Sequence, residues 1–242
     1  MVKGIRYFIL SLSWLFYPAV RPYLLAAMAV SILLFGSLAW TTNLFSAWFS
    51  SLLTAWIPIE WSGENTLYHW FIQILTFLIL IGIYKYIALG VLAPVMSLLS
   101  EKIVKIVSPE KQEKNSSGLM KGTIRGLLVN FVNLGKELMY TIFLMVFSLI
   151  PGMAFITTPL IFAVQCYYAG YGVMDFYLER YAGFSDSNRI VQREKWFALT
   201  TGAIFVLLFY IPLAGLILAP VTGTISSTLY MNKEKIAEKY VT

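Results

Sequence analysis

Arg21, Pro22 and Tyr23 are the first residues whose types and spacing point to binding chemistry. Proline is favoured at the first positions of a helix, so Pro22 predicts a helix start. Free backbone N–H groups at a helix start, together with a neighbouring guanidinium, bind anions. The tripeptide therefore predicts an anion site, with anchoring of Arg21 to lipid phosphate as the alternative.

A second group of charged side chains follows in the stretch 175–195, and its chief members are Asp175, Glu179, Arg180, Arg189 and Arg193. In one interpretation the arginines collect anions in a cytoplasmic vestibule, where Asp175 and Glu179 position Arg180. In the other interpretation the stretch is a solvated connection between two membrane-embedded segments.

Enzyme motifs are missing from the sequence. It contains neither a glycine-rich phosphate loop nor a nucleophile elbow. The single cysteine, Cys166, excludes a clustered-cysteine zinc site, and the single histidine, His69, excludes paired-histidine metal sites. Packing is the expected role of Cys166, and a structural role or a pH-sensitive gate that of His69. We expect no catalytic residue, no metal and no cofactor.

The amino-acid composition indicates whether the protein is surrounded by water or by lipid. Of 242 residues, 59% are hydrophobic and 12% are charged, against roughly 25% charged in a soluble domain. So few charges cannot cover the surface of a water-soluble chain of this size, which predicts an integral membrane protein with one domain over 1–242. The net charge of +6 indicates loops over anionic lipid headgroups rather than nucleic-acid binding.

Four long stretches lack Asp, Glu, Lys and Arg, and they cover residues 22–59, 65–84, 138–174 and 196–232. About 20 apolar residues span a bilayer as a helix. The first stretch predicts one long transmembrane helix and the second predicts another. Lys85 follows the second, where its flexible stem is expected to snorkel to the headgroups.

Proline and glycine predict breaks in the remaining apolar stretches, at Pro94, Pro151, Gly152, Pro159, Pro212 and Pro220. Pro94 predicts an elbow or an interfacial segment. The arms 138–150 and 196–211 are short, which favours two re-entrant helical hairpins that dip partway into the bilayer. Each hairpin repeats an Ile-Pro pair and a second proline eight residues later, which indicates a duplicated element.

Amphipathic patterns at 2–19 and 119–138 predict two interfacial helices, the second leading into the first hairpin. If 22–59 crosses once, 65–84 crosses back and both hairpins return to their own side, every Lys and Arg faces one side. The positive-inside rule makes that side cytoplasmic, together with both termini.

Several short motifs follow one another along the chain: Arg21 before the long span, Ala93-Pro94 followed by Leu98-Leu99-Ser100-Glu101, Ile150-Pro151-Gly152 with Pro159, Asp175 with Arg180 and Phe184, and Ile211-Pro212 with Ala219-Pro220. In this order they resemble the CysZ family of bacterial sulfate permeases, which are related to the etoposide-induced membrane proteins of eukaryotes. The resemblance runs from Gly4 to about Met231. Sulfate-carrying relatives place two adjacent arginines before the long helix, and here Pro22 replaces the second.

The resemblance implies two long transmembrane helices with hemi-penetrating hairpins, in a homo-oligomer embedded in lipid. It also implies movement of sulfate, or of a similar small anion, across the bacterial inner membrane for cysteine synthesis. The replacement at Pro22 leaves open a less specific anion site or a branch that does not carry sulfate. A non-transporting membrane scaffold or envelope-stress protein is the alternative function, and an intramembrane lipid enzyme is a third.

Overall fold

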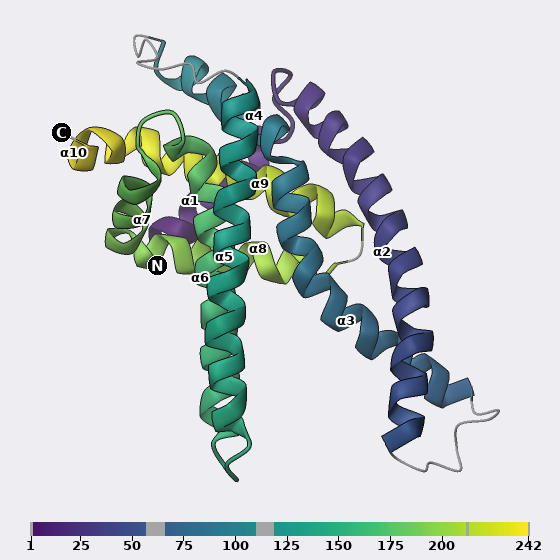
Figure 1. The fold of residues 1–242 in the computed structure, drawn as a ribbon. Helices are drawn as coiled ribbons and strands as arrows, with labels where there is room; N and C mark the ends of the chain where they lie inside the picture. The colour runs from purple at the N-terminus through teal and green to yellow at the C-terminus, as the bar shows by residue number, and fades with distance from the viewer. Residues whose placement is uncertain (1, 57–65, 110–118, 212, 242) are drawn as a thin grey trace.

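The computed structural model describes residues 2–56, 66–109, 119–211 and 213–241, and within them the chain forms ten helices and no strand. Three helices are long and apolar enough to cross a membrane, or up to four spans if a bent pair counts as one. The predicted class, an all-α membrane protein, is confirmed. The helices are α1 (Val2–Trp14), α2 (Arg21–Trp56), α3 (Thr66–Val91), α4 (Ala93–Val107), α5 (Leu119–Ser148), α6 (Ala154–Leu178), α7 (Phe184–Arg193), α8 (Lys195–Phe209), α9 (Ala214–Lys233) and α10 (Ile236–Val241) (Figure 1).

Helix α2 is continuous over the described part of the first charge-free stretch, as predicted, and residues 57–59 lie outside the description. Its 36 residues reach about 54 Å, well beyond the roughly 30 Å of a hydrocarbon core. The polar patch in its middle does not interrupt it. The Oγ1 atoms of Thr41 and Thr42 donate to the carbonyl of Leu38, at 3.0 and 2.7 Å. These bonds satisfy both hydroxyls inside the helix.

The predicted elbow near Pro94 separates α3 from α4. The chain bends by 57° between Val91 and Ala93. Pro94 lies in the first turn of α4, where the absence of an N–H donor costs no helical hydrogen bond. The bend directs α4 across the end of the molecule, so that its residues face α6 and α9.

The first hairpin, α5–α6, has longer arms than the sequence predicted. The separate interfacial helix over 119–138 is wrong, because α5 is one helix of 30 residues. Helix α6 has 25 residues and continues through Pro159, so the predicted break there is wrong as well. Pro159 lies near the start of α6, and the loss of one i−4 hydrogen bond there is tolerated. Pro151 and Gly152 lie in the turn, where the φ of Gly152 is +84°.

An ion pair explains the length of the first arm. An isolated carboxylate is costly inside a bilayer. From the sequence we therefore expect the first hairpin arm to start directly after Glu137. In the structure, Lys85 of α3 donates to both carboxylate oxygens of Glu137, at 2.9 and 3.1 Å. The expected snorkelling of Lys85 is wrong, since this residue is only 3% exposed. The pair neutralises both charges, so α5 continues past Glu137.

The second hairpin, α8–α9, is central, and its arms differ in length, because α9 has 20 residues and is one of the three helices long enough to cross a membrane. Helix α8 has 15 residues, or about 22 Å, too short to cross a bilayer. Pro212 lies outside the described residues. Helix α9 continues through the buried Pro220, so the predicted break there is wrong. Both hairpins thus carry their second proline inside a continuous return helix.

Close backbone contact holds the two hairpins together at the crossing of α6 and α8, which is the most extensive helix pair. A Cβ atom built on Gly202 of α8 would lie 1.7 Å from the carbonyl oxygen of Cys166 in α6. A glycine is therefore required there, as in the small-residue contacts of other membrane helices.

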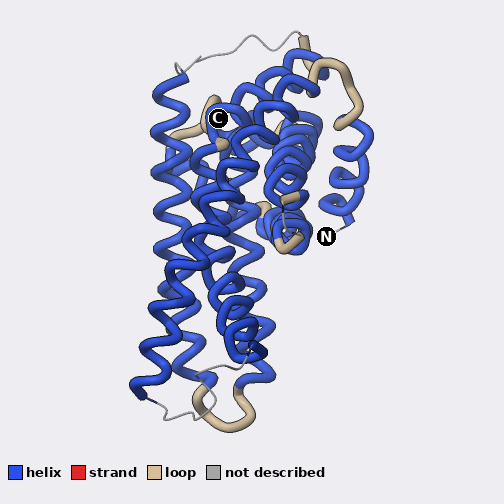
Figure 2. The backbone as a smooth tube through the Cα atoms, turned by 90° about the vertical axis from the view of Figure 1, so that its right-hand side faces the viewer, coloured by secondary structure: helices blue, strands red, loops and turns tan. Residues whose placement is uncertain are grey.

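Helix α2 lies beside α3, and α5 lies beside α6. The turn of the α5–α6 hairpin lies at the same end of the molecule as the ends where α2 finishes and α3 begins (Figures 1 and 2). Helix α10, at the C-terminal end of the chain, lies in the other half. Helix α9 packs among α1, α2, α4, α6 and α8, and nearly all of its residues are buried. The polar side chains of α9 are therefore in the interior.

Candidate functional site

A buried guanidinium is the central feature of the candidate site. Arg180 follows the end of α6 and is 8% exposed. Its Nη1 donates to the carbonyl of Ser97 at 3.1 Å, and its Nη2 donates to Oγ of Ser100 at 2.7 Å. The rings of Tyr177 and Tyr181 lie 5.7 and 5.9 Å from its Cζ. Helix α4 and the end of α6 therefore hold the side chain in place.

Arg180 has no ion-pair partner in the described part of the chain. Its Nε is buried and also finds no hydrogen-bond partner there. From the sequence we expected Asp175 and Glu179 to position Arg180, but in the structure both carboxylates bind other side chains. Glu179 accepts a hydrogen bond from the hydroxyl of Ser97, and Asp175 pairs with Arg125. A buried guanidinium that makes no direct ion pair is costly, and the nearby carboxyl of Glu179 acts on Arg180 only through its charge at longer range.

Arg125 of α5 connects this region to α7. Its Nη2 lies 3.1 Å from Oδ1 of Asp175 and donates to Oγ of Ser187 at 2.7 Å. Its Nη1 donates to the carbonyl of Ala182. We call Arg125, Asp175, Glu179 and Arg180 the arginine cluster. The sequence interpretation missed Arg125, because it placed this residue on the polar face of an interfacial helix.

Burial changes the acidity of the cluster. Glu179 lies beyond the last residue of α6, and desolvation raises the pKa of its carboxyl from 4.5 to about 7. The hydrogen bond from Ser97 and the charges of Arg180 and Arg125 oppose this rise, whereas the charge of Asp175 adds to it. Glu179 therefore changes charge near neutral pH, next to the guanidinium of Arg180.

Buried hydroxyl groups continue from the cluster along α9. Thr228 shares a hydrogen bond of 2.7 Å with Ser100, the residue that also binds Arg180. The hydroxyls of Thr224, Ser226 and Ser227 are buried and have no partner within the described residues. Hydroxyl groups rotate to donate to an oxyanion. The interior of the protein thus offers a run of donors next to a guanidinium.

The predicted anion site at the start of α2 consists of Arg21, Pro22 and Tyr23, and none of these residues belongs to the arginine cluster. Arg21 and Pro22 are exposed. The N–H groups of Tyr23 and Leu24 both donate to the carbonyl of Val20, at 3.1 and 3.0 Å. The expected free N–H donors after Pro22 are therefore already used inside the helix start, and the guanidinium of Arg21 is the group left for an anion.

Arg189 and Arg193 lie on α7 and make contacts of their own. Arg189 is exposed and lies 3.6 Å from Asp186. The guanidinium of Arg193 lies 4.9 Å from the ring of Tyr240. The structure therefore groups Asp175, Glu179 and Arg180, and it leaves these two arginines outside the cluster. No group of three or more His, Cys, Asp or Glu side chains placed to hold a metal occurs within the described ranges.

Long apolar helices packed around the buried helix α9, which carries polar side chains, define an all-α integral membrane protein. The chain belongs to the EI24 family, described as "Sulfate transporter CysZ/Etoposide-induced protein 2.4", whose model matches residues 7–220. It is similar to the "Sulfate transporter CysZ" of Pseudomonas fluorescens (strain Pf0-1), with 24% identity over 247 residues, 100% of this chain and 98% of that protein. The resemblance found in the sequence motifs is confirmed, and the family is one of transporters rather than enzymes.

Proposed function

We propose that this protein is a sulfate permease of the bacterial inner membrane, which takes up sulfate or a similar small anion for cysteine biosynthesis. The family and the name of the Pseudomonas relative support sulfate as the substrate. The observation that carries the proposal is the buried guanidinium of Arg180, which lacks a carboxylate partner among the described residues. A bound oxyanion supplies the missing charge and accepts from Nε.

The arginine cluster and α9 together form the inner anion site of this proposal. Sulfate has two negative charges and four acceptor oxygens, so it requires a cation and several donors. Arg180 supplies the cation, and the hydroxyls of Ser100 and Thr228 supply donors beside it. The hydroxyls of Thr224 and Ser227, which have no partner among the described residues, lie within one turn of Thr228 on the same side of α9 and add further donors. Protonation of Glu179 removes a competing negative charge from the site.

Arg21, Pro22 and Tyr23 form the entry contact in this proposal. Arg21 is exposed at the start of α2, where its guanidinium attracts an anion before the anion reaches the interior. An exposed arginine is screened by water and salt. The entry contact therefore contributes less to affinity than Arg180 does.

The orientation follows from the distribution of Lys and Arg. We place all Lys- and Arg-bearing loops and both termini in the cytoplasm, with homo-oligomers surrounded by lipid. In a Cys166→Ser background, a Ser62→Cys variant should react with an impermeant maleimide from outside intact cells, and a Ser116→Cys variant should not. Equal labelling of both would contradict a single orientation.

Sulfate flux into liposomes that contain the purified full-length protein tests the proposed function. Wild-type protein should carry radiolabelled sulfate, and Arg180→Ala should reduce the initial rate at least about tenfold, as expected for a lost charge-assisted hydrogen bond. Arg189→Ala is the matched control, since it removes an exposed arginine outside the cluster. Absence of flux with the wild-type protein would contradict the proposal and favour the scaffold alternative.

A further inference from the structure

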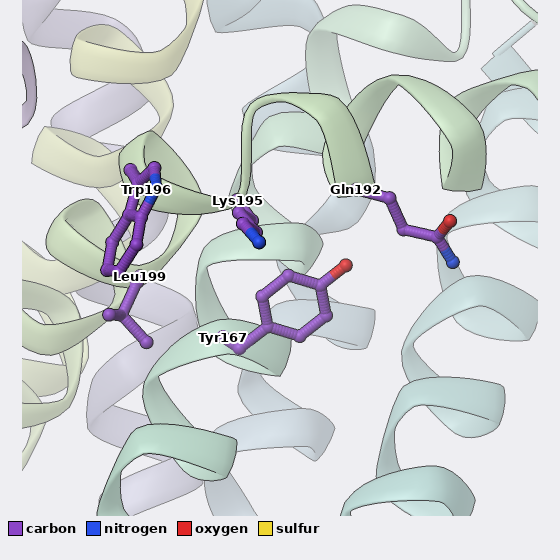
Figure 3. A pocket seen from close by; sticks show the side chains of 5 residues that line it. All are labelled: Tyr167, Gln192, Lys195, Trp196 and Leu199. Carbon is purple, nitrogen blue, oxygen red and sulfur yellow. The ribbon is translucent and has the colours of Figure 1, made fainter.

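A pocket lies where α7 meets α8, on the side of α6, and it is distinct from the arginine cluster. It has a volume of about 420 Å³ and is lined by Tyr167, Gln192, Lys195, Trp196 and Leu199 (Figure 3). Lys195 lies in the middle of the group, with Trp196 and Leu199 on one side, Gln192 on the other and the ring of Tyr167 next to it. One wall is thus apolar and aromatic, and the other is polar.

Lys195 has an ammonium group available for an anion. It is exposed, and it makes no ion pair with the described residues. The acidic neighbour Glu194 is already engaged, because the hydroxyls of Tyr230 and Tyr240 donate to its carboxylate at 2.6 and 3.2 Å. The Nζ of Lys195 lies 5.8 Å from the ring of Trp196. The pocket therefore presents one positive charge above an aromatic floor.

The pocket lies at a boundary between polar and apolar chain. Helix α7 is strongly charged, whereas α8 has no charged residue after Lys195. Trp196 is 57% exposed although it is a large apolar residue. Trp and Tyr accumulate where a membrane meets water, and Lys near such a boundary reaches toward the headgroups. A charged helix followed by Lys195, Trp196 and an apolar helix is the order expected where a chain enters a membrane at the level of the lipid phosphates.

We infer that this pocket binds the phosphate of an anionic phospholipid on the cytoplasmic side of the membrane, which is a site separate from that of the transported anion. The Nζ of Lys195 and the amide of Gln192 donate to the phosphate oxygens. Trp196, Tyr167 and Leu199 pack against the glycerol and the first methylenes of the acyl chain. A choline headgroup is disfavoured, because its positive charge would lie close to Lys195.

Native mass spectrometry of the purified full-length protein tests this inference, with phosphatidylglycerol and phosphatidylcholine of identical acyl chains as probes. The first phosphatidylglycerol should bind more tightly than the first phosphatidylcholine. Lys195→Ala should weaken the binding of phosphatidylglycerol by about tenfold or more, as expected for one charge-assisted hydrogen bond. Lys195→Arg should retain most of the affinity, which shows that the pocket is still folded.

Lys102→Ala is the matched control, since it removes an exposed lysine of α4 away from the pocket. It should bind both lipids as the wild type does. Equal affinities of Lys195→Ala and wild type, or an equal loss in Lys102→Ala, would overturn the inference. Inorganic phosphate at millimolar concentration should not displace the lipid. Displacement by phosphate would assign the pocket to a soluble anion and would also overturn the inference.

Discussion

Two buried ionic groups in this molecule differ in how completely they are satisfied. In the Lys85–Glu137 pair, Lys85 contacts both carboxylate oxygens, and the hydroxyl of Tyr86 donates to the same carboxylate. In the arginine cluster, Nε of Arg180 and Oδ2 of Asp175 have no partner among the described residues. Arg180 itself has only neutral oxygen atoms as hydrogen-bond partners.

We propose that this difference separates a structural role from a binding role. A closed ion pair joins α3 to α5 and leaves no charge for a ligand. A buried guanidinium that makes no direct ion pair is costly to hold in the interior, and an anion that binds to it would lower this cost. The first group should therefore determine stability, and the second should determine affinity for the transported anion.

Removal of one partner of the closed pair should have the largest effect. Glu137→Gln leaves the ammonium of Lys85 buried and uncompensated, which costs about 3–5 kcal/mol in comparable pairs. The midpoint of thermal unfolding in detergent should fall strongly. The double variant Lys85→Met, Glu137→Met should recover much of this loss, because it leaves no buried charge. A Glu137→Gln variant as stable as the wild type would break the comparison.

Substitution of Arg180 should affect affinity rather than stability. Arg180→Ala should weaken sulfate binding by roughly tenfold to a hundredfold, which corresponds to one or two charge-assisted hydrogen bonds. Arg180→Lys should be intermediate, because it keeps the charge but loses the fork of donors. Calorimetric titration with sulfate measures the effect, and Arg189→Ala should titrate like the wild type. Unchanged affinity in Arg180→Ala would remove the cluster from the anion site.

The protonation of Glu179 should make sulfate binding depend on pH. Burial raises the pKa of this carboxyl to about 7, so it is neutral below this pH and negative above it. Affinity should therefore fall several-fold as the pH rises through 7, since the new charge faces Arg180. The free energy of unfolding should also decrease as the pH rises from about 4.5 to 7. In this range Glu179 keeps its proton in the folded state and loses it in the unfolded state.

Glu179→Gln should remove this step in a pH titration of sulfate affinity. The other charged groups that face Glu179 are Asp175 of α6, Arg125 of α5 and Arg180. A step near pH 7 that persists in Glu179→Gln would assign the titration to another group.

Substitution of Arg21 should have the smallest effect. The N–H groups that follow it are bonded to Val20, so the guanidinium acts without backbone donors. Exposed ionic contacts contribute up to about 1 kcal/mol, so Arg21→Ala should weaken sulfate binding by less than about fivefold. A loss as large as that of Arg180→Ala would reverse the ranking of the two sites. Lipid anchoring as the sole role of Arg21 predicts poorer membrane insertion with unchanged affinity.

The sequence by itself determined the membrane class, the long helix α2, the elbow before Pro94 and the position of the first turn at Pro151 and Gly152. These features depend on local properties. A charge-free stretch measures the length of a span, and proline and glycine act on the backbone of their own turn. The motif order also identified the family, because it needs no knowledge of spatial contacts.

The tertiary structure decided which charges lie inside the protein. Lys85 and Glu137 are 52 residues apart, and Arg125 and Asp175 are 50 apart. The cost of burying one charge depends on whether a partner meets it, and no local pattern shows that partner. For this reason the sequence predicted a first hairpin arm that begins after Glu137 and an interfacial helix that carries Arg125. The packing of α3, α5 and α6 brought each charge to its partner, and it left Arg180 without one among the described residues.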